Sequence, residues 1–171
     1  WAEIKDTVPH EQRVKWLDDY LAQDAAAWAA EHRGIVWVQS VALGHKISEI
    51  SGLPYHGGGP ESEELIRAES GKRSIICSIA AHGSGRDGLQ EKFYEQLYAE
   101  LPSGNKRMEQ GLGRIHRTGQ PSDYVLTEAY LHAPELRESL RKIIAGAEFN
   151  FAMTGIRPKI LMADMDVSME F

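Results

Sequence analysis

The sequence predicts an α/β domain of three layers, in which helices cover both faces of a doubly wound parallel sheet. Two short apolar runs, "GIVWVQS" at residues 34–40 and "SIICSIAA" at residues 74–81, are rich in β-branched side chains and typical of strands buried on both faces. Stretches with a helical spacing of apolar residues alternate with these runs. Because a strand, a helix and a second parallel strand form one crossover unit, this alternation indicates a parallel sheet.

In the first half of the chain, each expected helix has a recognisable start or end. Pro9 suits the first turn of one helix and Pro60, with the acidic residues after it, suits the first turn of another. Gly34 and Gly52 follow two expected helix ends. The helices are expected at residues 9–32, 41–52 and 60–70. Between the last two, "LPYHGGG" predicts a short strand that runs into a glycine loop.

The stretch "LQEKFYEQLYAELP" at residues 89–102 allows two interpretations. Its local propensity favours a helix, whereas its place between a loop and a proline allows a short strand at residues 96–101. The next expected helix covers residues 105–118, where Gly119 and Pro121 would stop it.

The last part of the chain predicts one more strand and one more helix. "SDYVLTEAYLH" has the β-branched and aromatic content of a strand, and Pro134 opens a clear helix over "PELRESLRKIIAGAEF". Residues 154–171 carry no signal that favours either element.

Composition and charge narrow the class of protein. The net charge is −6, which argues against a domain that binds nucleic acid by bulk electrostatics, although residues 103–120 hold four basic residues and one acidic residue. With one cysteine, Cys77, and scattered histidines, a metal site is not expected. No apolar run approaches the ~20 residues that span a bilayer, so no membrane partner is expected. We expect a reducing, cytoplasmic environment and, since the chain does not begin with methionine, a piece of a longer protein.

A glycine-rich loop and a pair of arginines are the candidates for ligand binding. Residues 83–88, "GSGRDG", follow a buried strand, and their glycines would let the backbone approach a phosphate or a sugar; a plain turn is the alternative. The loop is neither a Walker A loop nor a dinucleotide fingerprint, because the spacing of its residues differs from both. On the expected helix at 105–118, Gln110, Arg114 and Arg117 would share one face and could direct two guanidinium groups at one anion. Surface salt bridges are the alternative use of the two arginines.

Four stretches resemble motifs of one protein family. "EQGLGRIHRTGQ" closely resembles motif VI of superfamily 2 helicases and translocases, above all of the Swi/Snf-like branch and its bacteriophage relatives. "CSIAAHGSGRDGLQ" looks like motif V, "GIVWVQS" resembles the strand of motif IV, and "YHGGG" resembles the His-Gly that follows the next strand. The four stretches occur in the family's order and cover residues 34–131.

The resemblance implies the second, C-terminal RecA-like lobe of a two-lobed motor. Arg114 and Arg117 would reach the phosphates of ATP bound on the other lobe, and Gln110 would order the same cleft. Gly111 and Gly113 would let their helix pack against the motif V loop and the partner lobe. The residues implied near the nucleotide ribose are Gly83, Gly85, Arg86 and Asp87. The residues implied at the backbone of DNA or RNA are Ser40, His56, Gly57 and Ser78.

The chain also departs from a complete motor of this family. It has no Walker A lysine and no acidic Walker B box, so ATP with Mg²⁺ would be held mainly by an N-terminal RecA-like lobe of the same parent chain. Motif V here has one more residue before its leucine than the commonest pattern, which leaves the roles of Arg86 and Asp87 open. The implied organisation is a linker helix at 1–33, the lobe at 34–132, and a C-terminal helix and tail at 133–171.

Two other functions are compatible with the sequence. The chain could be a stand-alone RecA-like module that binds nucleic acid or protein and has no ATPase activity. It could also be a small nucleotide-handling enzyme with "HGSGRDG" as its own phosphate loop, although the sequence offers no evident base or metal ligand for it. The paired arginines favour the motor lobe, because a pure binding module has no need of them.

Overall fold

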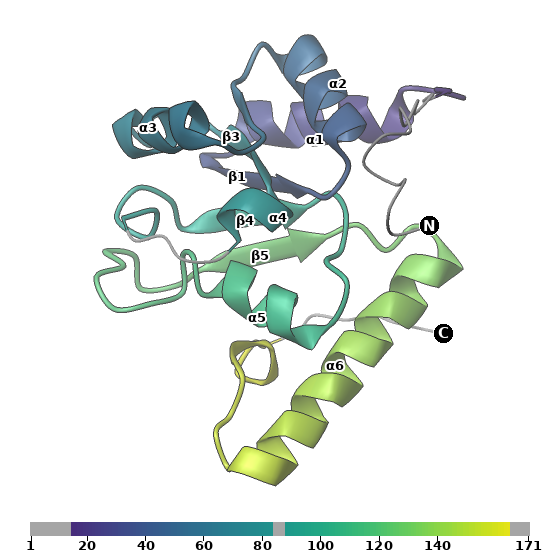
Figure 1. The fold of residues 1–171 in the computed structure, drawn as a ribbon, viewed down its shortest axis with the longest axis vertical. Coiled ribbons are helices and arrows are strands. Elements are labelled where there is room, and N and C mark those ends of the chain that lie inside the picture. Colours follow the sequence, from purple (N-terminus) through teal and green to yellow (C-terminus); the bar gives the residue numbers. More distant parts are fainter. Residues whose placement is uncertain (1–14, 84–87, 165–171) are drawn as a thin grey trace, which may run out of the picture.

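The computed structural model describes residues 15–83 and 88–164, and its centre is a five-stranded parallel sheet with the strand order β2-β3-β1-β4-β5 (Figure 1). Every neighbouring pair of strands is parallel. The strands are β1 (Gly34–Val38), β2 (Tyr55–His56), β3 (Ile75–Ser78), β4 (Glu95–Tyr98) and β5 (Leu126–Ala129). This arrangement confirms the α/β fold class and the parallel sheet that the sequence predicts.

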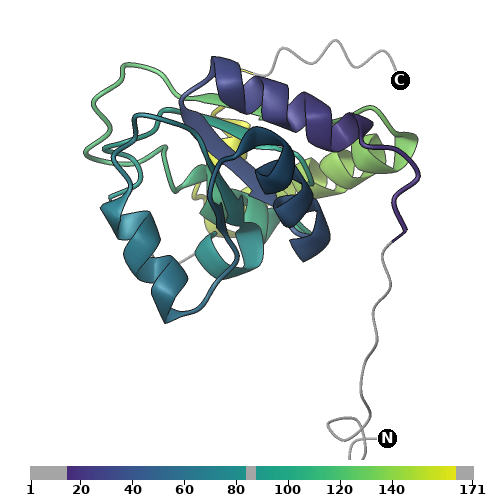
Figure 2. The same ribbon diagram turned by 90° about the horizontal axis from the view of Figure 1, so that it is seen from above.

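Helices cover both faces of the sheet and complete three layers. They are α1 (Tyr20–Glu31), α2 (Val41–Ser51), α3 (Pro60–Ala68), α4 (Ile79–His82), α5 (Asn105–Leu112), α6 (Pro134–Thr154) and the 3₁₀ helix η1 (Lys159–Leu161). Figure 2 shows α1 and α2 together over one face. None of these helices, within the described ranges, is long and apolar enough to cross a membrane.

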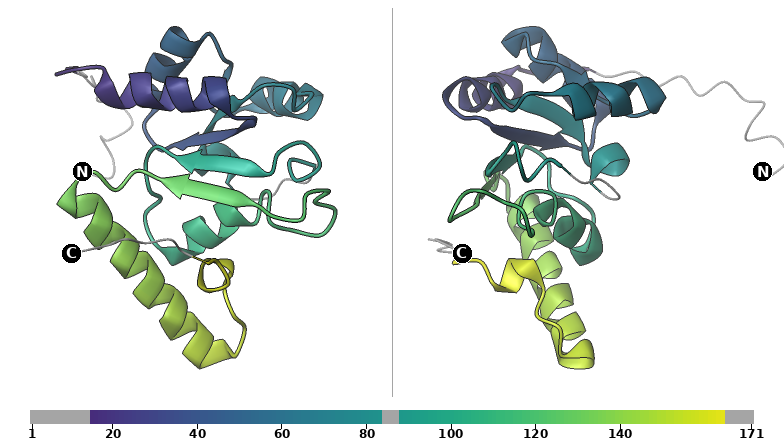
Figure 3. Two further views of the ribbon diagram at one scale, coloured as in Figure 1. Left: turned by 180° about the vertical axis from the view of Figure 1, so that it is seen from behind. Right: turned by 90° about the vertical axis from the view of Figure 1, so that its left-hand side faces the viewer.

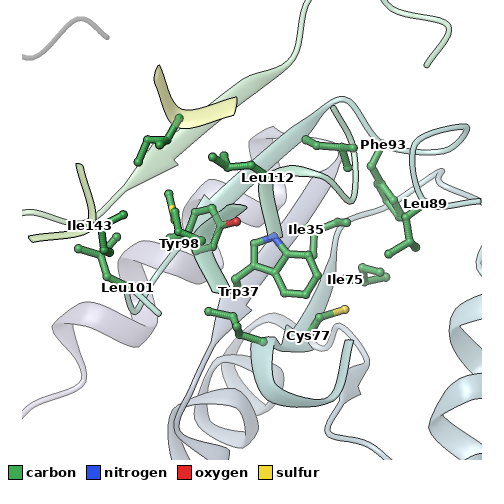
Figure 4. Packing of buried hydrophobic residues seen from close by; sticks show 14 of the residues in the cluster. Ile35, Trp37, Ile75, Cys77, Leu89, Phe93, Tyr98, Leu101, Leu112 and Ile143 are labelled. Atoms are coloured by element: carbon green, nitrogen blue, oxygen red, sulfur yellow. The ribbon is translucent and has the colours of Figure 1, made fainter. Parts of the chain in front are cut away.

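The alternation of side chains along β1 divides the core in two. Val36 and Val38 face α1 and α2, whereas Ile35 and Trp37 face the cluster formed by α3, α4, α5 and α6. In that second cluster Trp37 stacks against Tyr98 of β4, with ring centroids 6.4 Å apart (Figure 4). All five residues of β1 are buried, which explains the uninterrupted apolar run in the sequence.

Several element boundaries differ from the sequence-based expectation. The first helix begins at Tyr20, and residues 15–19 are not helical, while residues 9–14 lie outside the described ranges. The expected strand at 74–81 ends at Ser78, whose hydroxyl accepts a hydrogen bond from the main-chain N–H of Ala81 and starts the short helix α4. The last helix continues beyond Phe149 to Thr154, and Gly155, where φ is +69°, caps its end.

The four residues Glu95–Tyr98 of the ambiguous stretch at 89–102 form strand β4. Its residues lie between β1 and β5, where Gln96 is fully buried and pairs with Ile35 and Thr127. Pairing on both sides in the sheet therefore decides against the local helix propensity.

Candidate functional site

The expected helix at 105–118 ends at Leu112, so the prediction that Gln110, Arg114 and Arg117 share one helical face is wrong. Residues 113–120 form a series of turns, which we call the arginine turn. The main-chain N–H of Arg114 donates to the carbonyl of Gly111 at 3.0 Å, and that of Arg117 donates to the carbonyl of Ile115 at 3.2 Å. Two glycines weaken the helix at this point, and the fully buried Ile115 fixes the chain in the core.

The two arginines of this turn have different surroundings. Arg114 is 8% exposed, and its Nε donates a hydrogen bond of 3.3 Å to the carbonyl oxygen of Gln110. Arg117 is exposed. The structure thus separates an arginine that packs beneath the turn from one whose side chain lies at the surface.

Gly111 serves the packing of α5 against the sheet. A Cβ atom at this position would lie 2.3 Å from the hydroxyl oxygen of the fully buried Tyr98 on β4. At Gly113 the nearest atoms are carbonyl oxygens of α5 itself, at 3.3 and 3.4 Å. The expectation that these glycines contact the motif V loop and a partner lobe is therefore wrong for Gly111, because the side chain of Tyr98 from β4 occupies the space beside it.

Gln120 is a residue of this region to which the sequence analysis gave no role. Its Nε2 donates to the carbonyl oxygens of Phe93 and Ile115, at 2.8 and 3.0 Å, and its Oε1 accepts from the N–H of Ser122 at 3.1 Å. Gln120 is the last residue of the quoted motif VI stretch, which is the one sequence signal that could have drawn attention to it.

The glycine-rich loop ends beside the arginine turn. Gly83 is buried, and its N–H donates to the carbonyl of Ile79 at 2.9 Å, while Gly85, Arg86 and Asp87 lie outside the described residues. Gln90 follows the far end of the loop, and its side chain lies close to the arginine turn. A Cβ on Gly119 of that turn would lie 3.7 Å from Nε2 of Gln90. The segments that lead into β4 and β5 accordingly lie side by side at the amino ends of these strands (Figures 1 and 3).

Three of the four residues implied at nucleic acid lie at the end of the sheet opposite to the arginine turn. This end is formed by the carboxyl ends of the strands, and we call it the carboxyl edge. Gly57 and Ser40 follow the carboxyl ends of β2 and β1, and Ser78 ends β3, the strand between them. Gly57 is exposed, Ser40 is half-buried and caps α2, and Ser78 is 5% exposed. The structure therefore gathers these residues on one edge, although they differ in access to solvent.

His56 is the least exposed of the four residues. It is 1% exposed, and its Nε2 lies 3.6 Å from a carboxylate oxygen of Glu69. Burial lowers the pKa of His56 below its usual value, and the Glu69 carboxylate offsets part of this shift. The ring thus lies in the interior, where burial disfavours its protonated form.

Glu100 is a second residue without a role in the sequence analysis. One of its carboxylate oxygens accepts the N–H groups of Gln39 and Ser40, both at 2.7 Å, in a shallow open hollow that is also lined by Val41 and Ala42. The hollow lies at the carboxyl ends of the neighbouring strands β1 and β4. The helices that follow these strands, α2 and α5, pack on opposite faces of the sheet. In open α/β sheets, ligands bind at such a position. Its carboxylate places negative charge next to Ser40.

Comparison with known proteins supports the fold. The structure is similar to the crystal structure of the C-terminal part of the Fun30 ATPase domain, with a TM-score of 0.53 and 10% sequence identity. The similarity covers 67% of this chain and 40% of that one, so this chain spans less than half of the length of the solved structure. No protein-family model matches the sequence, and no curated protein matches it. At this identity the likeness defines the class of fold, a RecA-like α/β sheet.

Proposed function

We propose that this chain is the C-terminal, second motor lobe of an ATP-dependent helicase or translocase of superfamily 2, in its Swi/Snf-like branch. Two features support this function besides the four motifs. The fold is similar to that of the C-terminal part of the Fun30 ATPase domain, and Arg117 is exposed on a turn next to the end of the motif V loop. The position of Arg117 carries the proposal. The resemblance to bacteriophage members stays a prediction from the sequence.

Arg117 fits the role of an arginine that reaches ATP held by the N-terminal lobe. Its guanidinium group stays charged at any working pH and can pair with two phosphate oxygens. When bound, ATP with Mg²⁺ supplies the phosphoryl group, and it is held mainly by the N-terminal RecA-like lobe. An arginine at the transferred group stabilises the charge that develops there and contributes about 10³ to 10⁵ in rate.

Arg114 and Gln110 support this residue from beneath the turn. Because Arg114 is buried and bonds the carbonyl of Gln110, its first role is to hold the end of α5 against the turn that follows. Gln110 itself is half-buried, next to this contact. Together they order the part of the cleft that belongs to this lobe.

Nucleic acid binds, in this proposal, along the carboxyl edge of the sheet at Ser40, Gly57 and Ser78. Contacts of hydroxyl and main-chain groups with phosphates position a strand but carry no sequence information directly. The segment from Ser78 to Gln90 leads from this edge to the arginine turn at the other end of the sheet. It therefore supplies a covalent connection between the two proposed sites, although its residues 84–87 lie outside the described ranges.

The test is ATP hydrolysis by the parent chain that includes the N-terminal lobe. Hydrolysis is measured without nucleic acid, with single-stranded DNA and with duplex DNA, for the unchanged protein and for Arg117→Ala. We expect stimulation by DNA and a loss of at least roughly a hundredfold in Arg117→Ala. Arg141→Ala is the matched control, because Arg141 is an exposed arginine on α6 that pairs with Glu138. Full activity of Arg117→Ala would refute the role of that residue, and absence of hydrolysis would refute the motor lobe.

A further inference from the structure

The side chain of Gln120 connects the arginine turn to the sheet by a hydrogen bond to the carbonyl of Phe93. We propose that Gln120 is a positioning residue, which fixes the main chain on both sides of Arg117 and so sets where its guanidinium group points. The inference rests on the proposed function, since it assigns Gln120 a part in the same reaction. It concerns a residue that acts through Arg117 and does not itself touch the nucleotide.

Gln120 holds the turn through both its side chain and its main chain. Its Nε2 donates to the carbonyl of Ile115, two residues before Arg117, at 3.0 Å, and its main-chain N–H donates to the carbonyl of Arg117 itself at 3.2 Å. The same Nε2 donates to the carbonyl of Phe93 at 2.8 Å. Because Phe93 is 1% exposed and lies just before β4, this bond connects the turn to the rigid centre of the sheet.

The partners of Gln120 require the chemistry of a carboxamide. The carbonyls of Phe93 and Ile115 can only accept hydrogen bonds, whereas the N–H of Ser122 can only donate one. One end of the side chain must therefore provide two donors and the other end an acceptor, as glutamine does. Glutamate would place a charged oxygen against two carbonyl oxygens, and asparagine is one methylene shorter.

The anchor matters because residues 113–120 do not form a continuous helix. Their main-chain groups depend on turn bonds and on side chains such as Gln120. A displacement of about 1 Å in a group that stabilises a transition state can cost up to roughly a hundredfold in rate. Release of this turn should consequently reduce turnover more than it reduces nucleotide binding.

The experiment uses the parent chain with the variants Gln120→Ala and Gln120→Glu. Gln96→Ala is the matched control, because Gln96 is a buried glutamine of β4 that bonds Trp37 and Thr127, each at 2.9 Å, away from the turn. Three kinds of experiment are carried out: kinetics of DNA-stimulated ATP hydrolysis, which give kcat and KM, hydrogen exchange of peptides that cover residues 113–122, and thermal unfolding. Arg117→Ala is measured in parallel.

We expect both Gln120 variants to lower kcat by roughly tenfold or more, with KM for ATP within about threefold, since the loss falls on the transition state. Exchange in residues 113–122 should become faster in these variants. The Gln96→Ala protein should unfold at a lower temperature but keep its kcat and its exchange in this segment.

Each other outcome overturns the inference in a recognisable way. Unchanged kcat in the Gln120 variants, with activity lost in Arg117→Ala, would overturn the positioning role alone and leave the proposed function standing. A lower kcat without faster exchange at 113–122 would show that Gln120 does not act by holding the turn. Absence of hydrolysis in the unchanged parent chain would overturn the proposed function and this inference together.

Discussion

Replacing Gly111 by alanine tests whether α5 lies directly against β4. The new Cβ would be placed 2.3 Å from the hydroxyl oxygen of Tyr98, about 1 Å closer than an ordinary contact. The phenol cannot move aside easily, because it is fully buried and its ring stacks on Trp37. Something in the helix or the sheet must therefore shift.

The expected loss of stability is the difference between two effects. Overpacking of a core costs about 1–3 kcal/mol, and a contact against a rigid ring lies at the upper end of that range. Alanine in place of glycine stabilises a helix interior by about 1 kcal/mol. The net loss is then about 2 kcal/mol, which lowers the Tm of a chain of this length by about 4–8 °C.

Thermal and urea unfolding of Gly111→Ala, Tyr98→Phe and the double variant measure this effect. Without the hydroxyl, the nearest ring atom to the new Cβ is Cζ at 3.3 Å, so the double variant should recover at least about 1 kcal/mol of the loss. Gly113→Ala is the control, since its Cβ would meet no atom closer than 3.3 Å and its φ is −67°. Normal stability of Gly111→Ala, or no recovery in the double variant, would refute the packing argument.

Three further predictions follow from the same geometry. Arg114→Ala should lower the free energy of unfolding by about 1–2 kcal/mol, whereas Arg117→Ala should change it by less than about 0.5 kcal/mol, as measured by urea unfolding, because only the first is buried. Burial lowers the pKa of His56, so below about pH 6.5 the unfolded chain binds more protons than the folded chain. The free energy of unfolding should therefore fall as the pH drops through that value. Denaturation curves at pH 7.5 and 5.5 should differ less for His56→Asn than for the unchanged protein. Glu100→Gln removes a negative charge beside the N–H of Ser40 and should tighten binding of single-stranded DNA several-fold at low salt, which fluorescence anisotropy detects; unchanged affinity would argue against a nucleic-acid contact at this edge.

The parts of the fold that the sequence predicts are those governed by burial on both faces. The apolar runs that became β1 and β3 are uniformly buried, so their composition alone indicates strands. The stretch around Gln96 is different, because its place in the sheet depends on pairing with strands about 30 and 60 residues away in the chain. Local propensity depends on nearby residues alone and therefore does not predict this long-range pairing.

The candidate site shows the same limit. The resemblance to motif VI indicates Arg117, but the complete burial of Ile115 just after the end of α5 is not evident from a local pattern. The sequence does not indicate the hydrogen bond of Gln120 to Phe93 or those of Glu100 to Gln39 and Ser40, because these partners lie 27 and about 60 residues away along the chain. Long-range hydrogen bonds of this kind become visible only in the folded protein.

The most direct test of the motor lobe is the structure of the parent chain bound to ADP and beryllium fluoride, which stands in for the γ-phosphate. The account predicts that the guanidinium group of Arg117 lies within hydrogen-bonding distance of the fluoride, at about 2.7–3.2 Å. It also predicts that Gln120 keeps its bonds to Phe93 and Ile115 in that complex. An ordered Arg117 that points away from the bound nucleotide, with the fluoride held by other residues, would contradict the account.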